Sequence, residues 1–306
     1  MVAGALNQDD LYVDITLAGV LDEHGLDATT EDFGTFFRDT RYSLWHANLA
    51  ARRNLRRGVP AAESGTPRHN VHFNDIDFQI EADFFGLMTP GLPRASNELC
   101  ERAGRVMNHG EGIHGGMFVS AMYSAAFFES DPRRIVEAGL AVLPSESPYA
   151  LLIADVLAWS QRHPEDWIRV WELIDEHWNR DEPCSEGALR PFNIDAKING
   201  AYVALGLLYG GGDFAETMLI ATRAGQDSDC NPASAAGILG VVLGFDGIPV
   251  EYTSGIEAIA DETFSYTEAT FRTIVADTVR RAIAMVERHG GRLEGDALIV
   301  PQQAPE

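Results

Sequence analysis

Apolar residues recur every three or four positions along most of the chain, which is the period of a helix that buries one face. Between Leu11 and Glu23 this spacing is clear, and His24-Gly25 ends the segment with a typical helix stop. A capping pattern at Thr30 opens a second helix. The same reasoning predicts further helices over residues 42–57, 96–107, 112–128, 132–141, 148–162, 164–179, 194–209, 213–223, 234–243 and 263–289.

The segments between these helices carry little regular pattern. Residues 61–74 are rich in Pro, Ser and His and are typical of an exposed loop, and residues 181–191 form another break. The tail, residues 292–301, is the only segment with strand character, and it is short. No internal repeat and no shift in composition divides the chain. We therefore expect an all-α fold in which residues 1–306 form a single compact multi-helix domain, with at most a short C-terminal strand.

The net charge and the cysteines indicate which binding partners and which cellular compartment to expect. The 306 residues include 46 acidic and 23 basic ones, which gives a formal net charge of −23. A surface this negative repels nucleic acid and anionic membranes, so we expect neither as a partner. Cys100, Cys184 and Cys230 lie far apart without CxxC spacing, which is typical of reduced thiols in a cytoplasmic protein. We also expect no signal peptide and no membrane span.

The first acidic cluster lies at the start of the first helix. Asp9 and Asp10 follow Gln8, and Asp14 comes four residues after Asp10. Carboxylates at this end are stabilised by the free N–H groups and the helix dipole, so simple capping is one interpretation. Asp14, however, shares a helix face with Asp10, and like charges at this spacing repel each other unless a cation lies between them. The residues alone leave capping and cation binding both open.

The second acidic cluster, Asp227-Ser228-Asp229-Cys230, precedes the predicted helix 234–243. Asp-x-Asp after a glycine suits Mg²⁺ or Ca²⁺, although the acids do not continue as they would in an EF-hand loop. The following helix is rich in Ala and Gly, which permits close packing, so we expect it to be central. A pair of acids at the head of a buried helix is costly unless a metal or donors satisfy it, and this favours a functional role over capping.

Two further stretches hold polar residues that could contact a substrate. Glu81 and Asp83 lie in the first stretch, and His109, Glu111 and His114 lie in the second, within a glycine-rich segment. The histidines could be general bases or zinc ligands, but no thiolate or further histidine stands at zinc-like spacing. All five residues are therefore candidates for substrate binding rather than for a zinc site.

These clusters, in this order, resemble the ADP-ribosylglycohydrolase family, which includes the enzymes that remove ADP-ribose from arginine on dinitrogenase reductase. In that family a Thr-Asp-Asp near the N-terminus and an Asp-x-Asp-Thr/Ser near the C-terminus bind two magnesium ions. Gln8-Asp9-Asp10 and Asp227-Ser228-Asp229-Cys230 occupy the matching places. The other segments that are similar to the family are residues 87–93, 109–116 and 225–240 and the pair Ile248-Pro249.

The resemblance implies a site for two Mg²⁺ ions, with Mn²⁺ as a possible substitute. The implied metal ligands are Gln8, Asp9, Asp10, Asp227, Asp229 and Cys230. Gln8 stands where the family usually has Thr, and Cys230 where it has Thr or Ser, and a thiol is a poor ligand for a hard cation. The family's Gly-rich N-terminal helix, with its substrate-facing Glu, has no counterpart before Gln8. Either the chain is shortened there or Glu81, Asp83 or Glu111 takes that part.

The implied function is a Mg²⁺-dependent hydrolase of an N- or O-ribosidic bond. Its substrate would be an ADP-ribosylated protein or an ADP-ribosyl or nucleoside-type metabolite. Asp10 or Asp14 would act as the general base with Asp9 beside them, and nearby carboxylates would stabilise an oxocarbenium-like state. The bound ions would offset the acidic site for a diphosphate-bearing substrate. The alternative is a catalytically impaired protein that binds ADP-ribose or a nucleotide through the metal without cleaving it.

Overall fold

Helices account for nearly all regular structure in the computed structural model, which describes residues 7–180 and 194–305. The α-helices in chain order are α1 (Asp9–His24), α2 (Thr30–Arg38), α3 (His46–Arg56), α4 (Ala61–Ser64), α5 (Asp77–Ile80), α6 (Asp83–Leu87), α7 (Pro93–Gly104), α8 (Glu111–Ala126), α9 (Pro132–Ala141), α10 (Pro148–Arg162), α11 (Trp167–Trp178), α12 (Ala196–Tyr209), α13 (Phe214–Ala224), α14 (Cys230–Leu243), α15 (Val250–Thr253) and α16 (Phe271–Arg288). The 3-10 helices η1 (Phe245–Gly247) and η2 (Glu257–Ile259) flank α15, and an antiparallel hairpin of β1 (Arg292–Glu294) and β2 (Ala297–Ile299) follows α16. The predicted all-α class with a short C-terminal strand region is confirmed.

Most predicted helices are present, and their largest differences lie at their starts. The short helices α4, α5, α6 and α15 were not predicted. Helix α3 begins at His46 rather than at residue 42. Helix α14 begins at Cys230, directly after the acids, rather than at residue 234. Helix α16 begins at Phe271 rather than at residue 263, because Thr270 and Thr273 form a capping box that sets the start there.

The segment predicted as an exposed loop, residues 61–74, is partly ordered and partly buried. It contains α4, and the side-chain amide of the buried Asn70 donates to the carbonyls of Ala47 and Met107. Residues 1–6, the predicted break at residues 181–191 and Cys184 lie outside the described residues. Among the helices that the structure describes, none has both the length and the apolarity to cross a bilayer. The cytoplasmic location stays a prediction.

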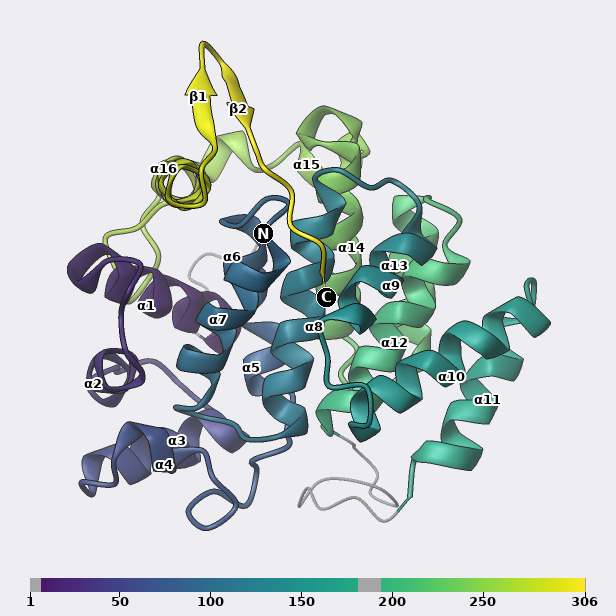
Figure 1. Ribbon diagram of the computed structural model, residues 1–306, viewed down its shortest axis with the longest axis horizontal. Coiled ribbons are helices and arrows are strands. Elements are labelled where there is room, and N and C mark those ends of the chain that lie inside the picture. Colours follow the sequence, from purple (N-terminus) through teal and green to yellow (C-terminus); the bar gives the residue numbers. More distant parts are fainter. Residues whose placement is uncertain (1–6, 181–193, 306) are drawn as a thin grey trace.

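The hydrophobic core has two parts that meet at α8. One part gathers side chains of α8, α9, α10, α12 and α14, such as the fully buried Phe118 and Ile153. The other gathers side chains of α1, α2 and α7, such as Leu17 and Phe33. Figure 1 shows α1 and α2 on one side of α8 and α9 to α13 on the other. Met117 of α8 packs against both parts, which favours the predicted single domain, although the domain organisation stays a prediction.

The small residues of α14 allow this helix to approach its neighbours closely, as the sequence predicts. It packs against α8, α12 and α13. A Cβ atom at Gly237 would overlap the hydroxyl of Tyr123 on α8, whereas one at Gly240 would lie 3.4 Å from Cδ1 of Ile248, an ordinary distance. The acids at the head of α14 are therefore held against the centre of the molecule.

Helix α16 is joined to α1 by ion pairs. The guanidinium of Arg281 donates to the carboxylate of Asp22 at 3.1 and 2.5 Å, and Arg288 pairs with Asp27. The Arg281 guanidinium also lies over the ring of Phe84 on α6, 5.6 Å from the ring centre. These contacts hold α16 beside α1 and α6, where it forms one wall of the larger cavity described below.

Candidate metal centre

The first turn of α1 holds two of the predicted metal ligands. Asp9 and Asp10 are half-buried there, and Gln8 at the N-cap is exposed and makes no capping hydrogen bond with its side chain. Backbone N–H groups of this turn lower the pKa values of both acids, as a capping role would require, but burial outweighs them. Burial, followed by the charge of Asp10, raises the pKa of Asp9 to about 6. Capping alone therefore does not stabilise the ionised pair.

The loop before α14 presents the second acidic cluster. Asp227 is buried, and its N–H donates to Oδ1 of Asn199 on α12 at 3.1 Å. Ligand atoms of Asp227, Asp229 and Cys230 lie within 4.8 Å of one another. Burial, followed by the neighbouring carboxyl of Asp229, raises the pKa of Asp227 to about 7. Gln226 in the same loop has a φ of 56°, which non-glycine residues rarely adopt.

The two clusters, far apart in the sequence, meet in the fold. The charge of Asp229 contributes to the raised pKa values of both Asp9 and Asp10. The charge of Asp10 acts in turn on Cys230, whose pKa is raised chiefly by burial. A small cavity of about 180 Å³ lies between α1 and α14, and Asp10 and Cys230 are among its lining residues.

Further acids lie near Asp9, one in α5 and one directly after it. Asp77 and Glu81 are buried, and burial and neighbouring carboxylates raise the pKa of each well above its ordinary range. After burial, Asp77 and Asp9 have the largest effects on the pKa of Glu81. Asn48 on α3 positions both acids, because its N–H donates to Oδ1 of Asp77 at 2.9 Å and its side-chain amide donates to Oε1 of Glu81. The start of α3 therefore belongs to the same carboxylate region.

Asp14 and Asp83 form a carboxyl pair in the wall of the small cavity. Burial is the main cause that raises both pKa values, that of Asp83 to about 6 and that of Asp14 well above its ordinary range. The two groups are within hydrogen-bonding reach of each other, so they can share one proton.

Two buried carboxylate oxygens in this region indicate whether the residues suit a bound cation. Oδ1 of Asp14 and Oε2 of Glu81 have no hydrogen-bond partner within the described part of the chain. An ionised carboxylate in such surroundings is costly unless a cation or a proton joins it. Carboxylate oxygens are also the ligands that Mg²⁺ and Mn²⁺ prefer. The residues present therefore fit a hard divalent cation.

Comparison of the sequence with protein families is consistent with a metal site built from these carboxylates. The sequence model of the family described as ADP-ribosylglycohydrolase matches residues 3–286 of the 306. The chain belongs to the ADP-ribosylglycohydrolase family. Membership indicates a metal-dependent hydrolase that acts on glycosidic bonds, and the predicted resemblance is confirmed. Comparison with curated proteins gives no significant match.

The structure also holds a ligand group that the sequence patterns did not predict. Ligand atoms of His46 at the start of α3, Asp75 just before α5 and Asp77 lie within 4.8 Å of one another. One signal could have revealed part of it, because the stretch from Asp75 to Asp83 places four acids among apolar residues. Acids are rarely buried without a partner, so such a stretch is unusual inside a fold.

The glycine-rich segment that was predicted to bind substrate contacts α10. Oε2 of Glu111 accepts a hydrogen bond from the N–H of Tyr149 on α10 at 2.5 Å, and Oε1 lies 3.1 Å from Nδ1 of His114. His109 is exposed. The contact with Tyr149 joins α8 to α10, and the contact with His114 lies within α8. A substrate-binding role for His109, Glu111 and His114 stays a prediction, whereas Glu81 and Asp83 lie among the carboxylates.

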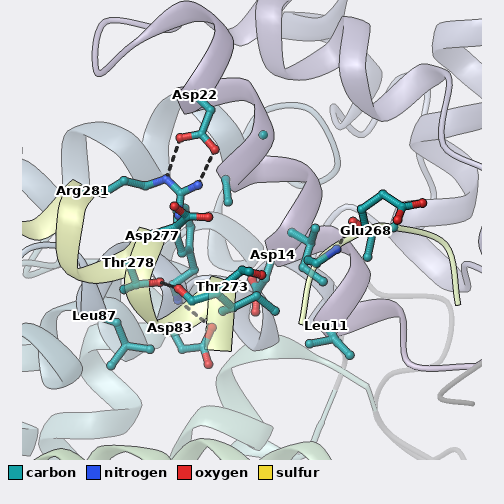
Figure 2. A pocket seen from close by; sticks show the side chains of 17 residues that line it. Leu11, Asp14, Asp22, Asp83, Leu87, Glu268, Thr273, Asp277, Thr278 and Arg281 are labelled. Carbon is teal, nitrogen blue, oxygen red and sulfur yellow. Dashed lines mark hydrogen bonds and ion pairs between the residues drawn. The ribbon is translucent and has the colours of Figure 1, made fainter. Parts of the chain in front are cut away.

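A larger cavity of about 580 Å³ adjoins the small one and shares Leu11, Asp14 and Asp83 with it. It lies between α1, α6 and α16. Figure 2 shows Asp14 and Asp83 in its wall together with the ion pair of Arg281 and Asp22. Its volume is within the range that binds nucleotide-sized ligands.

Proposed function

We propose that this protein uses Mg²⁺ to hydrolyse an N- or O-ribosidic bond in an ADP-ribosylated protein or an ADP-ribosyl or nucleoside-type metabolite. The observation that carries the proposal is that Asp10, Asp14 and Asp83 line one small cavity between α1, α6 and α14, while the charge of Asp229 acts on the acids of α1. So many adjacent acids can be ionised at neutral pH only if cations join them. Family membership supplies the class of reaction.

The proposed ligands of two Mg²⁺ or Mn²⁺ ions are Asp9, Asp10, Asp227 and Asp229. Their support is the effect of Asp229 on the pKa values of both acids of α1. When bound, the ions would hold the ribose diol and polarise a water molecule. Gln8 could add an amide oxygen from its exposed position, and the thiol of Cys230 is the weakest of the implied ligands for a hard cation.

The larger cavity is the proposed place of the substrate, because Asp14 and Asp83 line both cavities. The anomeric carbon would lie near this junction. Burial raises the pKa of Asp83 to about 6 and that of Asp14 well above its ordinary range, so the pair holds a proton more readily than exposed carboxyls do. Such a pair can give a proton to the leaving nitrogen or oxygen as its bond to the anomeric carbon breaks, and can take one from the attacking water. Asp10, which lines the small cavity beside Asp14, is the other candidate base.

A protein that binds ADP-ribose without cleaving it is the second candidate. Cys230 favours it, because this residue stands within the ligand group of Asp227 and Asp229. A thiol coordinates hard cations weakly, so an ion there could be held too loosely for turnover.

Release of ADP-ribose from arginine- and serine-modified protein, with Mg²⁺ and after metal removal, tests the proposal. We expect release only with Mg²⁺, and at least about a 100-fold loss of turnover in Asp10→Asn and in Asp227→Asn. Asp246→Asn, an exposed acid in η1, is the control and should not change the rate. Full turnover in both site variants would contradict the proposal. A Mg²⁺-dependent rise in thermal stability with ADP-ribose, without any release, would favour the second candidate.

A further inference from the structure

We propose that His46, Asp75 and Asp77 form a second cation site, the histidine site, next to the proposed Mg²⁺ ligands, and that it takes a first-row transition ion such as Zn²⁺ in preference to Mg²⁺. This inference goes beyond the proposed hydrolase and does not depend on its substrate. One ligand atom from each residue lies within 4.8 Å of the other two, so a single ion can contact all three. Three protein ligands with open positions are typical of sites that also bind water or a substrate.

The two carboxylates of the histidine site are buried and held by backbone contacts. Asp75 is fully buried and forms an isolated antiparallel bridge with Asp195, next to α12. Oδ1 of Asp77 accepts the N–H of Asn48 at 2.9 Å. Ligand oxygens of the two carboxylates lie within 4.8 Å of each other.

Asn48 gives an independent indication of a ligand. This residue is fully buried and connects Asp77 with Glu81 through its N–H and its side-chain amide. Its Oδ1 has no hydrogen-bond partner within the described part of the chain. A buried oxygen without a donor is costly, and a water molecule bound to an ion in the histidine site would satisfy it.

The imidazole of His46 determines which ion the site prefers. Nitrogen ligands suit Zn²⁺ and its first-row neighbours, whereas Mg²⁺ prefers oxygen ligands alone. His46 has a φ of 33°, a conformation that non-glycine residues keep only where the surroundings impose it. Its side chain is half-buried, which leaves a path for an ion from solvent.

His72 is the positioning residue for this site. Its Nδ1 lies 2.7 Å from Oδ2 of Asp75, and its ring centre is 5.5 Å from that of His46. Metal-ligating carboxylates are usually fixed by such an outer hydrogen bond, and losing it weakens metal binding. The competing explanation is that His46 and His72 are protonated and act only as counter-charges for the two acids.

Zn²⁺ binding to the metal-stripped full chain by equilibrium dialysis tests the proposal. The measurement is made in the Cys230→Ser background, which removes the thiol of the other ligand group, and with Mg²⁺ in excess to occupy the carboxylates. We expect Zn²⁺ binding that Mg²⁺ does not displace. His46→Gly should weaken it by at least about 100-fold and His72→Ala by about 10- to 100-fold. His24→Gln, at the exposed end of α1, is the matched control and should leave it unchanged.

His46→Gly is chosen because it should remain folded, so that a loss of Zn²⁺ binding cannot be due to unfolding. Glycine accepts a φ of 33° without strain, so the metal-free variant should unfold at the parent's temperature or above it. Undiminished Zn²⁺ binding in folded His46→Gly would overturn the histidine site. A parent chain that binds no Zn²⁺ in excess Mg²⁺ would also overturn the histidine site. In that case, a His46→Gly variant less stable than the parent at acidic pH would identify the histidines as counter-charges for Asp75 and Asp77.

Discussion

The carboxylate cluster predicts that raising the pH will destabilise the metal-free protein. In the folded chain the pKa values of Asp9 and Asp83 are raised from 3.8 to about 6. Between these two values the folded state binds more protons than the unfolded state. The stabilisation from each group is therefore complete below its unfolded pKa and is lost as the pH rises through about 6.

The size of the effect follows from the same pKa values. At about pH 5 each of the two groups is roughly one unit below its folded pKa, so reaching pH 8 costs about 1.4 kcal/mol per group. Together they lower the free energy of unfolding by about 3 kcal/mol, which for a chain of this length lowers the melting temperature by about 5 °C. Asp227, whose pKa is raised to about 7, acts in the same direction. Bound Mg²⁺ stabilises the ionised forms, so it should remove most of the loss.

Thermal unfolding followed by tryptophan fluorescence, with chelator or with Mg²⁺, measures this directly. Sodium chloride at matched ionic strength controls for screening of the net negative charge. Asp9→Asn should reduce the pH-dependent loss by about 1.4 kcal/mol, because it removes one of the titrating groups. The exposed Asp246→Asn should not reduce it. A melting temperature of the metal-free protein that stays constant or rises with pH, or one that falls equally steeply in Mg²⁺, would refute the reasoning.

Two further predictions concern α14 and the residue at its head. Gly237→Ala should lower the free energy of unfolding by about 1–3 kcal/mol, because its Cβ would overlap Tyr123, whereas Gly240→Ala should be neutral or stabilising by up to about 1 kcal/mol. Chemical denaturation of the two variants compares these effects, and equal changes in stability would contradict this packing. Cys230→Ser should bind Mg²⁺ at least as tightly as the parent and Zn²⁺ less tightly, because it replaces a sulfur ligand by an oxygen ligand. Calorimetric titration measures both affinities, and weaker Mg²⁺ binding in the variant would contradict this reasoning.

The positions of the helices could be predicted because their buried apolar residues repeat every three or four positions. Where each helix begins depends instead on capping residues, which this repeat does not reveal. The segment before α16 shows the difference. Phe264 packs against the core part formed by α1 and α2, and Tyr266 packs edge-on against Tyr12, with ring centres 4.9 Å apart, from a segment that is not helical. Phe264 is half-buried and Tyr266 is exposed, and both make these contacts from a loop. Thr270 then starts α16. Apolar residues before Thr270 therefore do not indicate a helix, and apolar content alone overestimates its length.

The candidate site was predictable where acids stand next to each other at a helix start, as in Asp9-Asp10 and Asp227-x-Asp229. It was not predictable at Asp77, because α5 has four residues and is too short to show a period. The approach of Asp75 to α12 depends on its bridge with Asp195, which only the tertiary structure creates. In the glycine-rich segment after His109, packing explains the pattern, since a Cβ at Gly112 would overlap the side chain of Asn108 and the carbonyl of Phe73.

The pH dependence and the metal dependence of this protein have one physical origin. A carboxyl that keeps its proton in the metal-free state, such as Asp9 with a pKa of about 6, must lose it when a cation binds. Mg²⁺ binding should therefore release protons and tighten as the pH rises through this value, while the metal-free fold weakens over the same range. Neutralising a ligand, as in Asp9→Asn, should then stabilise the metal-free protein at neutral pH and weaken its affinity for Mg²⁺. If instead Asp9→Asn left the metal-free stability and the Mg²⁺ affinity unchanged, Asp9 would be a cap of α1 and not a ligand.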